Sequence, residues 1–265
     1  MRRIADGSAD DKFISLENVT KTFTTPSGAI TVLSNISLQV KKGKTLCIVG
    51  PSGCGKTTIL NLISGFLAPT SGSIRVDGRP VRGPGPDRAV VFQRDSVFPW
   101  LTVRQNLEYG PKVQGIPRKE WAGRIDEYLN KVGLQDCANH YPKQLSGGMK
   151  KRVDIARAYT NRPDILLMDE PFGSLDVMTK EVMQQDLLEL SYKDQKSLIF
   201  ITHDIEEAVF LGDGVLVMTR SPANIEKEIE VPFPKPRHVS LKLQPEFQAM
   251  RKEIDAILKR KDLHA

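Results

Sequence analysis

The 265-residue sequence lacks any long hydrophobic run and has only 3 cysteines. Its longest apolar stretches, such as residues 165–168 and 198–201, are far shorter than the roughly 20 residues of a transmembrane helix. Cys47, Cys54 and Cys137 are odd in number and widely spaced, so they predict neither a disulfide framework nor a metal site made of cysteines. The start, MRRIADGSADD, has no apolar stretch after its arginines, which is not typical of a secretory signal. These absences favour a cytoplasmic protein without a membrane span of its own.

Neither sign of charge dominates the chain. Lys and Arg number 38 and Asp and Glu 32, which gives a formal net charge of +6. The basic residues are spread along the sequence, which favours a solvated surface over a nucleic-acid footprint, so no nucleic acid is expected as a partner. With 40% hydrophobic and 26% charged residues and no internal repeat, the composition is that of a globular protein with one large domain, or a domain with an inserted subdomain.

The most informative stretch is KTLCIVGPSGCGKTTILNLISGF. It contains a complete G-x-x-x-x-G-K-[ST] pattern between a predicted buried strand at residues 45–49 and a predicted helix. Glycines let consecutive amide groups turn inward around an anion, Lys56 reaches the β- and γ-phosphates, and Thr57 offers a hydroxyl to Mg²⁺. The helix start could also lower the pKa of the Cys54 thiol, although a small side chain that fits a tight loop is the favoured reading. The predicted ATP-binding residues here are Gly50, Pro51, Ser52, Gly53, Cys54, Gly55, Lys56, Thr57 and Thr58.

An acidic pair follows a second buried-strand pattern in PDILLMDEPFGSLD. Asp169 stands at the end of the strand, where open α/β sheets place ligand groups, and is predicted to hold Mg²⁺. Glu170 is the candidate for polarising the water that attacks ATP. The alternative is a surface turn with two acidic residues, which the phosphate loop earlier in the chain disfavours.

Two more predicted strands end in polar residues. SLIFITHD ends near His203, which could donate a hydrogen bond to a γ-phosphate, and RAVVFQ ends in Gln93, which could contact the metal or the attacking water. Together with Lys56 and Asp169, they predict one catalytic sheet edge.

A second helix start with the character of an anion site lies in YPKQLSGGMKKRVDIARAY. The Ser146 hydroxyl can cap the helix, and Gly147 and Gly148 leave its first amides uncovered. The alternative is an ordinary helix cap with Lys150, Lys151 and Arg152 on a wet face. Because one phosphate site is already complete, the second most simply binds the nucleotide of another copy. This predicts a head-to-tail homodimer with two ATP molecules at its interface.

In order and wording, these motifs resemble those of the ATP-binding cassette (ABC) ATPases. The resemblance covers residues 13 to about 231, and LSGGM is close to diagnostic of the family. It implies that Phe23 stacks on adenine and that Gln93 links the γ-phosphate to a transporter contact. It also implies that the turn Ser174-Leu175-Asp176 crosses the dimer interface, with Asp176 near nucleotide, and that His203 is the switch histidine.

The sequence departs from the family pattern at three positions. Lys151 stands where glutamine is common, Asp154 where alanine is common, and Phe23 where tyrosine is more usual. Phe23 keeps a stacking face. The other two are predicted to alter affinity for the partner's nucleotide without removing a catalytic group.

The predicted fold is α/β: a P-loop (RecA-like) core with an antiparallel β-subdomain and an inserted α-helical signature subdomain. The β-subdomain is expected over residues 13–40 as two or three short runs, and a turn-rich segment over residues 73–83. The helical insertion is expected at about residues 94–160, interrupted at Gly115-Ile116-Pro117. The ATPase domain would span residues 13–231. Residues 232–265 would form a proline-rich connector and an amphipathic helix, packed on the core or on a partner.

The predicted function is the ATPase subunit of a bacterial-type ABC importer, working on the inner face of the membrane with a separate multi-span permease. Phe98 and Trp100, in the loop DSVFPWLTV, are either subdomain core or a partner surface, and the resemblance favours a groove for the permease. Two alternatives stay open: an ABC ATPase that acts on DNA or ribosomes, and the ATPase of an exporter.

Three further segments bear on the transported solute. GPGPDRAVVFQ, FPWLTVRQNL and EIEVPFPKPR resemble the ATPases of nitrate, sulfonate and taurine importers. The resemblance implies a small anion as cargo and, indirectly, a solute-binding protein as partner.

Overall fold

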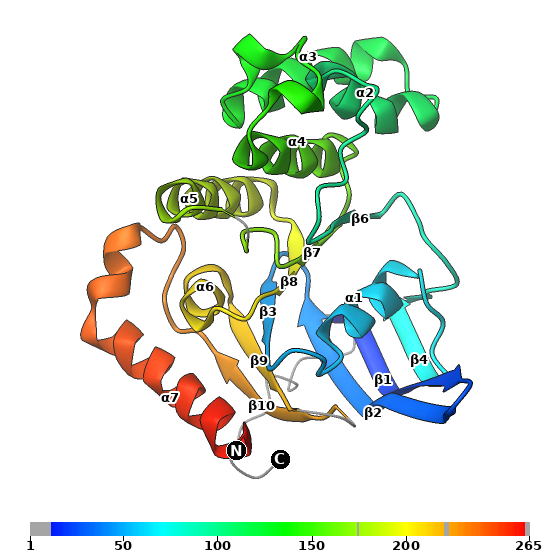
Figure 1. Cartoon of the computed structure of the whole chain (residues 1–265), viewed down its shortest axis with the longest axis vertical. Helices are drawn as coiled ribbons and strands as arrows, with labels where there is room; N and C mark the ends of the chain where they lie inside the picture. Colours follow the sequence, from blue (N-terminus) through cyan, green and yellow to red (C-terminus); the bar gives the residue numbers. More distant parts are fainter. Residues whose placement is uncertain (1–11, 174, 220–222, 263–265) are drawn as a thin grey trace.

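The computed structural model describes residues 12–173, 175–219 and 223–262. Its centre is a six-stranded sheet in the order β10-β9-β3-β8-β7-β6 (Figure 1). Strands β9, β3, β8, β7 and β6 run parallel, and β10 pairs antiparallel with β9 at one edge. The strands are β3 (Thr45–Val49), β6 (Arg88–Val91), β7 (Ile165–Asp169), β8 (Ser197–Ile201), β9 (Gly214–Met218) and β10 (Ile225–Glu230).

The central strands are apolar runs because helices or a second sheet cover both of their faces. Every residue of β3, β7, β8 and β9 is buried. Because side chains alternate across a strand, Leu46 and Ile48 join one apolar cluster while Cys47 and Val49 join the other. The first cluster includes α1 (Lys56–Ser64) and the antiparallel sheet, and the second includes α5 (Val177–Asp194) and α6 (Ile205–Leu211).

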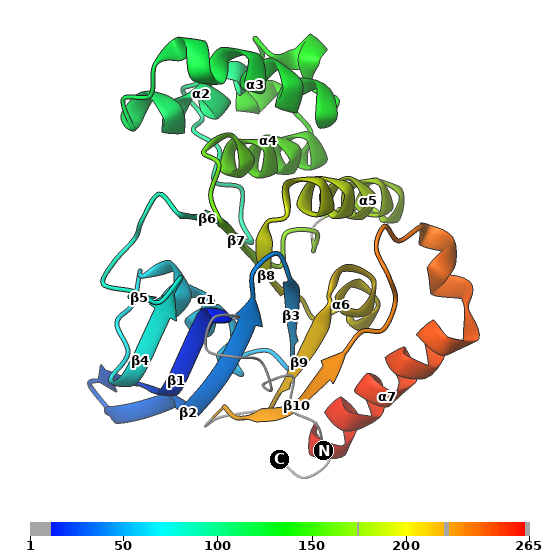
Figure 2. The ribbon, with the colours of Figure 1, turned by 180° about the vertical axis from the view of Figure 1, so that it is seen from behind.

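The second sheet is antiparallel, in the order β2-β1-β4-β5, and lies beside α1 (Figure 2). Its strands are β1 (Lys12–Thr25), β2 (Gly28–Lys41), β4 (Ser71–Val76) and β5 (Arg79–Pro80). The predicted antiparallel subdomain is therefore present, but its first two strands are long ribbons instead of several short runs.

The segment expected to be turn-rich, residues 73–83, also contains most of β4 and all of β5, which the sequence did not predict. One glycine near the start of β4 permits close pairing with β1. Gly72 has φ 87°, and a Cβ at this position would lie 2.4 Å from the Asn18 carbonyl oxygen of the neighbouring strand.

Three helices form a separate layer at one end of the molecule, above α5 in Figure 1. They are α2 (Val103–Val113), α3 (Arg118–Lys131) and α4 (Gly147–Thr160), with short 3-10 turns at Gln135–Cys137 and Pro142–Gln144. Thr102 and Gln105 form a reciprocal capping box at the start of α2. The helical conformation is interrupted between α2 and α3 at Gly115, which has φ 68°, as predicted.

The end of the chain returns along the core. After β10 comes a connector with a 3-10 turn, η4 (Val239–Leu243), and then α7 (Pro245–Asp262), which packs beside α6. The amphipathic pattern is realised as expected: Phe247 and Ile254 are fully buried, and Met250, Ile257 and Leu258 pack against the same core.

Two expectations fall outside the described residues: the reading of the first eleven residues, and the role of Ser174. Within the described ranges, no helix combines the length and the apolar character needed to cross a bilayer.

Candidate functional site

The parallel strands deliver the predicted polar residues to one edge of the central sheet. Asp169 at the end of β7 pairs with Ile201 at the end of β8, and Ile201 also pairs with Ile48 of β3. The phosphate loop follows β3, Glu170 follows β7, His203 follows β8, and Gln93 follows β6. Because these strands are parallel, their carboxyl ends meet on the same side, which is where this architecture places ligands. We call this side the catalytic edge.

The phosphate loop wraps the start of α1. The helix cap is Gly55, with φ 87° and no side-chain hydrogen bond to the first turn, so no side chain satisfies the leading amides of the helix. A Cβ at Gly53 would meet nothing within 4 Å, so this part of the loop is open on its outer side. Lys56 is buried and donates from Nζ to the carbonyl oxygens of Gly50 at 2.7 Å and Pro51 at 3.0 Å. Uncapped amides with an adjacent ammonium fit a phosphate group.

Close packing sets the glycine requirement on the inner side of the loop. A Cβ at Gly50 would lie 2.7 Å from Cys54 Sγ, and one at Gly55 would lie 2.7 Å from Leu33 Cδ2. Cys54 is 1% exposed. The alternative, a thiol pKa lowered by the helix start, is wrong: burial raises the pKa of Cys54, and the nearby Lys56 ammonium offsets that rise only in part. Cys54 is a small packing residue.

Thr57 and Asp169 form the pair expected of a magnesium site. The Thr57 hydroxyl donates to Asp169 Oδ2 at 2.9 Å. Burial raises the pKa of Asp169 and the neighbouring Glu170 adds to this, whereas the Thr57 hydrogen bond and Lys56 lower it. A carboxyl group in such surroundings is stabilised as the anion by a bound cation.

The residues present fit Mg²⁺. The candidate donors are the Thr57 hydroxyl, the Asp169 carboxylate and the Gln93 amide oxygen, all hard oxygen ligands. In the described ranges, no group of three or more His, Cys, Asp or Glu side chains could enclose a metal ion. A magnesium ion needs no such cage, because it keeps several waters and binds through one or two carboxylates plus substrate phosphates.

Glu170 is the meeting point of the catalytic edge. Its backbone has φ 43°, a left-handed conformation uncommon for a glutamate, and its amide donates to the Ile201 carbonyl oxygen at 2.9 Å. Its Oε2 accepts a hydrogen bond from Gln93 Nε2 at 3.1 Å and lies 3.2 Å from His203 Nδ1. The three residues predicted as catalytic are therefore in direct contact. The Gln93 amide nitrogen is bound to Glu170, which leaves its oxygen for a metal.

The second predicted anion site has a different construction. Ser146 caps α4, with its hydroxyl accepting from the Met149 amide at 3.2 Å. A Cβ at Gly147 would meet nothing within 4 Å, whereas one at Gly148 would lie 3.1 Å from Thr179 Cγ2. Asp176 caps α5 in the same way, accepting from the Thr179 amide at 3.0 Å. The starts of α4 and α5 thus lie together, in a different part of the molecule from the start of α1 (Figures 1 and 2).

Two residues after the signature glycines have roles that the sequence did not reveal. Lys151 is 1% exposed, and its Nζ donates to the carbonyl oxygens of Phe92 at 2.9 Å and Gln93 at 3.2 Å. Asp154 is 2% exposed and accepts hydrogen bonds from both the amide and the hydroxyl of Ser96, at 3.0 and 2.9 Å. The reading of Lys151 as a residue of a wet face is therefore wrong. Both residues tie α4 to the segment that carries Gln93.

The aromatic residues singled out in the sequence occupy two places. Phe23 is half-buried on β1 with the Lys21 ammonium over its ring. Phe98 contacts the rings of Trp100 and Tyr109, at centroid distances of 5.6 and 4.5 Å. Trp100 is 69% exposed and Tyr109 44%, whereas Phe98 is half-buried, so this cluster lies at the surface.

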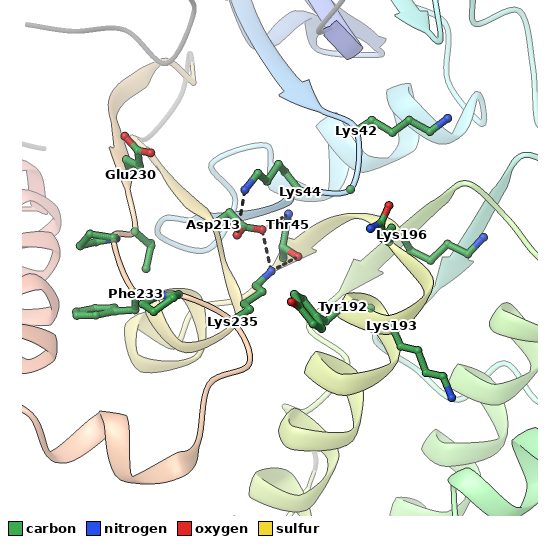
Figure 3. A pocket seen from close by; sticks show the side chains of 16 residues that line it. Lys42, Lys44, Thr45, Tyr192, Lys193, Lys196, Asp213, Glu230, Phe233 and Lys235 are labelled. Atoms are coloured by element: carbon green, nitrogen blue, oxygen red, sulfur yellow. Dashed lines mark hydrogen bonds and ion pairs between the residues drawn. The ribbon is translucent and has the colours of Figure 1, made fainter.

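The catalytic edge is distinct from a cavity of about 740 Å³ at the opposite end of the same strands (Figure 3). That cavity lies where β3 begins, at Thr45, and its lining includes Lys44, Asp213 and Lys235. None of the predicted site residues lines it.

Comparison with known proteins shows the family and the fold. The family model described as "ABC transporter" matches residues 33–173. The chain is 44% identical to the nitrate import ATP-binding protein NrtD of Synechocystis sp., over 93% of this chain and 95% of the relative. It is 42% identical to the taurine import ATP-binding protein TauB of Jannaschia sp., over 91% and 92%. A solved dimeric ATP-binding cassette in a post-hydrolysis state, bound to ADP and Pi, is 33% identical with a TM-score of 0.73, covering 83% of this chain and all of that one.

Proposed function

This chain belongs to the ABC transporter family as an ATP-hydrolysing subunit, and we propose that it drives uptake of a small anion through a separate membrane permease. One observation carries the assignment of catalytic roles. The side chains of Gln93 and His203 both contact Glu170 Oε2, beside the Thr57–Asp169 pair, on the edge that the phosphate loop borders. Residues that follow four strands therefore meet at two adjacent carboxylates, those of Asp169 and Glu170.

In the proposed mechanism, the loop from Gly50 to Thr58 binds the ATP phosphates through its amides and the Lys56 ammonium. Thr57, Asp169 and Gln93 would hold magnesium, which would supply positive charge beside the ATP phosphates. Phe23 covers the adenine ring.

Glu170 orients the attacking water and accepts its proton. His203 holds the Glu170 carboxylate in place and donates to the γ-phosphate, while Gln93 contacts the same carboxylate from the segment that leads from β6 into the helical layer. Catalysis here is positioning plus stabilisation of charge, since phosphoryl transfer leaves little covalent chemistry to the protein.

The proposed active form is a head-to-tail homodimer. Ser146, Gly147 and Gly148 of one copy would meet the phosphates bound by the other, and Asp176 would lie at the same interface. Support comes from the exposure of Ser146 and Gly147 and from the open space above Gly147. The similar cassette bound to ADP and Pi is itself a dimer.

The permease is proposed to dock beside the exposed face of the Phe98–Trp100–Tyr109 cluster. Val113 on α2 is also 69% exposed, which extends this apolar surface. Because Gln93 lies in the same segment as Phe98, a partner held there would be connected to Glu170. The chain would then work at the inner, cytoplasmic face of the membrane.

The proposed cargo is a small anion such as nitrate, a sulfonate or taurine, delivered by a solute-binding protein. The basis is the names of the two relatives. The test is co-purification of the permease, reconstitution in vesicles, and ATP hydrolysis with the solute-binding protein and nitrate, bicarbonate, taurine or an alkanesulfonate in turn. Stimulation by one anion identifies the cargo, and stimulation by none contradicts an anion importer.

The catalytic assignment is tested by Glu170→Gln. This variant is expected to bind ATP, to accumulate as a dimer, and to hydrolyse ATP at least about 100-fold more slowly, since proton transfer is lost. Glu189→Gln on the exposed side of α5 is the matched control and should behave as wild type. Hydrolysis by Glu170→Gln at the wild-type rate would remove Glu170 from its proposed role.

A further inference from the structure

The connector after β10 grips the helix that follows His203. Arg237 is 3% exposed, and its Nη1 donates to the carbonyl oxygens of Val209, Phe210 and Gly212, at 3.2, 2.9 and 2.7 Å. These carbonyl groups lie at the C-terminal end of α6. The last four carbonyl groups of an α-helix have no hydrogen-bond partner within the helix. A buried guanidinium there also complements the helix dipole. The connector therefore fixes the end of α6.

Lys242, in the 3-10 turn η4, grips the other end. Its Nζ lies 3.2 Å from Glu206 in the first turn of α6 and over the Phe210 ring, and the residue is 9% exposed. It also donates to Gln184 Oε1 of α5 at 3.1 Å. One lysine from the tail thus joins α5 to α6 close to the catalytic edge.

From Gln184, hydrogen bonds continue inward to both neighbours of His203. Gln184 Nε2 donates to Glu207 Oε1 at 3.2 Å, and Glu207 Oε2 accepts from the Thr202 hydroxyl. The same hydroxyl accepts from the Asp204 amide at 3.0 Å. Thr202 and Asp204 stand on either side of His203 in the chain.

The residues of this hydrogen-bond network are buried, which strengthens the hydrogen bonds between them. Gln184, Glu207 and Thr202 are 1, 4 and 1% exposed, and hydrogen bonds at such depth are strengthened by the low local dielectric. Without Lys242, no described side chain or backbone group donates to Gln184 Oε1. A buried amide oxygen without a donor favours rearrangement of its neighbours.

A second lysine, which is not in the tail, also contacts the start of α6. Lys180 of α5 lies 2.7 Å from Asp204 and 2.8 Å from Glu207. Burial is the largest single influence and would raise the pKa of Asp204, but the hydrogen bond and charge of Lys180, together with backbone amides of α6, hold that pKa below its usual range. Because Lys180 remains, loss of Lys242 is expected to move the start of α6 without unfolding it.

The connector itself is anchored at the far end of the sheet. Figure 3 shows Lys235 reaching Asp213 and Thr45, and its Nζ lies 2.7 Å from Asp213 Oδ2 and 3.2 Å from Thr45 Oγ1. With Phe247 buried in the core, the segment that carries Lys242 is held before and after that residue.

We propose that Lys242 is a positioning residue for His203. Through Gln184, Glu207 and Thr202, and through Glu206 of α6, it sets where the imidazole stands relative to Glu170 Oε2. The inference rests on the proposed role of His203 and Glu170 in ATP hydrolysis. It gives the tail a part in the chemistry, although the tail touches no reacting group.

The test compares Lys242→Met with Lys259→Met, a control on α7 whose side chain is 73% exposed and, among the described residues, pairs only with Asp255. We expect kcat to fall about tenfold for Lys242→Met with KM for ATP unchanged, because the phosphate loop lies on other elements. Lys259→Met should match wild type. Lys242→Arg, which keeps the charge and the donors, should restore most of kcat.

The decisive measurement is the same substitution in a His203→Ala background. If Lys242 acts through His203, adding Lys242→Met there should produce no further loss of kcat. An equal tenfold loss in both backgrounds, or a rise in KM together with the fall in kcat, overturns the proposal. Wild-type kcat in His203→Ala alone would instead contradict the proposed function. If Lys242→Met does not fold, Lys242→Gln serves in the same cycle.

Discussion

The starts of α1 and α4 are both suited to anions, yet they are built in opposite ways. At α1, the capping position is a glycine that gives no side-chain hydrogen bond, and a buried lysine lies beside the loop. At α4, Ser146 caps the helix, and the glycine after it faces open space. The first helix start has the features of a complete phosphate site. The second is a self-sufficient helix end with room above it.

The two helix starts also differ in the groups that lie beside them. Lys56 and Thr57 lie next to Asp169, so the α1 site finds both its phosphate and its metal ligands within one chain. Near α4, the contacts of Gly148 are with Thr179 and Leu175, at the start of α5, and not with the phosphate loop. The proposed phosphate at α4 would therefore belong to another copy of the chain.

The largest effect is expected from Gly147→Asp. Gly147 is exposed and its Cβ position is open, and an acidic residue in the first turn favours the helix, so the fold should be intact. The new carboxylate would face the partner's phosphates, and like charges brought together cost several kcal/mol, so hydrolysis should fall about 1,000-fold. ATP affinity of the dilute monomer, measured by equilibrium binding, should not change. Turnover near the wild-type rate would contradict the proposal that the start of α4 faces the partner's phosphates.

A smaller loss, in a different quantity, is expected from Lys56→Ala. Removal of a charge-assisted contact to phosphate should weaken ATP binding by the isolated chain about 100-fold. Titration calorimetry of the monomer measures it directly, with Lys150→Ala as the control. Unchanged affinity would show that α1 is not the primary nucleotide site.

Mixing these two variants sharpens the comparison further. In a heterodimer of Lys56→Ala and Gly147→Asp, one pocket combines both defects and the other combines both intact halves. Two inactive proteins should therefore regain part of the wild-type hydrolysis when combined. A mixture without activity or ATP-dependent pairing would contradict composite pockets.

The smallest effect is expected from Lys151→Met, which removes the bond between α4 and the Gln93 segment. Two carbonyl oxygens would lose their buried donor, at about 1–3 kcal/mol of unfolding free energy. Chemical denaturation should show this loss, with Lys150→Met as the control, since Lys150 makes no side-chain hydrogen bond or ion pair within the described ranges. Equal stability of both variants would mean that the α4 start needs no tether to Gln93.

Sequence reasoning succeeded where one short motif fixes both the chemistry and the backbone. The phosphate loop, the Asp169–Glu170 strand end and His203 each follow an apolar run, and parallel pairing then brings them together. The LSGGM segment likewise predicted the cap by Ser146, because the hydroxyl and the amide it accepts from are three residues apart.

Sequence reasoning failed where a charged side chain is buried by distant elements. Lys151 stands between Lys150 and Arg152, a pattern typical of a wet helix face, and only the fold brings the Phe92 and Gln93 carbonyls to it. Arg237 and Lys242 lie in a polar, proline-rich segment, so nothing local marks them as buried. Strands β4 and β5 were missed because their glycines and prolines are typical of turns.

The order of strands in the central sheet also bears on how the protein is made. Strand β3 precedes β6 and β7 in the chain, yet its neighbours are β8 and β9, residues Ser197–Ile201 and Gly214–Met218. During synthesis, β3 has no sheet partner until β8 and β9, which lie in the last third of the chain, have left the ribosome. We expect truncated nascent chains to expose this apolar strand and to depend on chaperones until β8 slots in between β3 and β7.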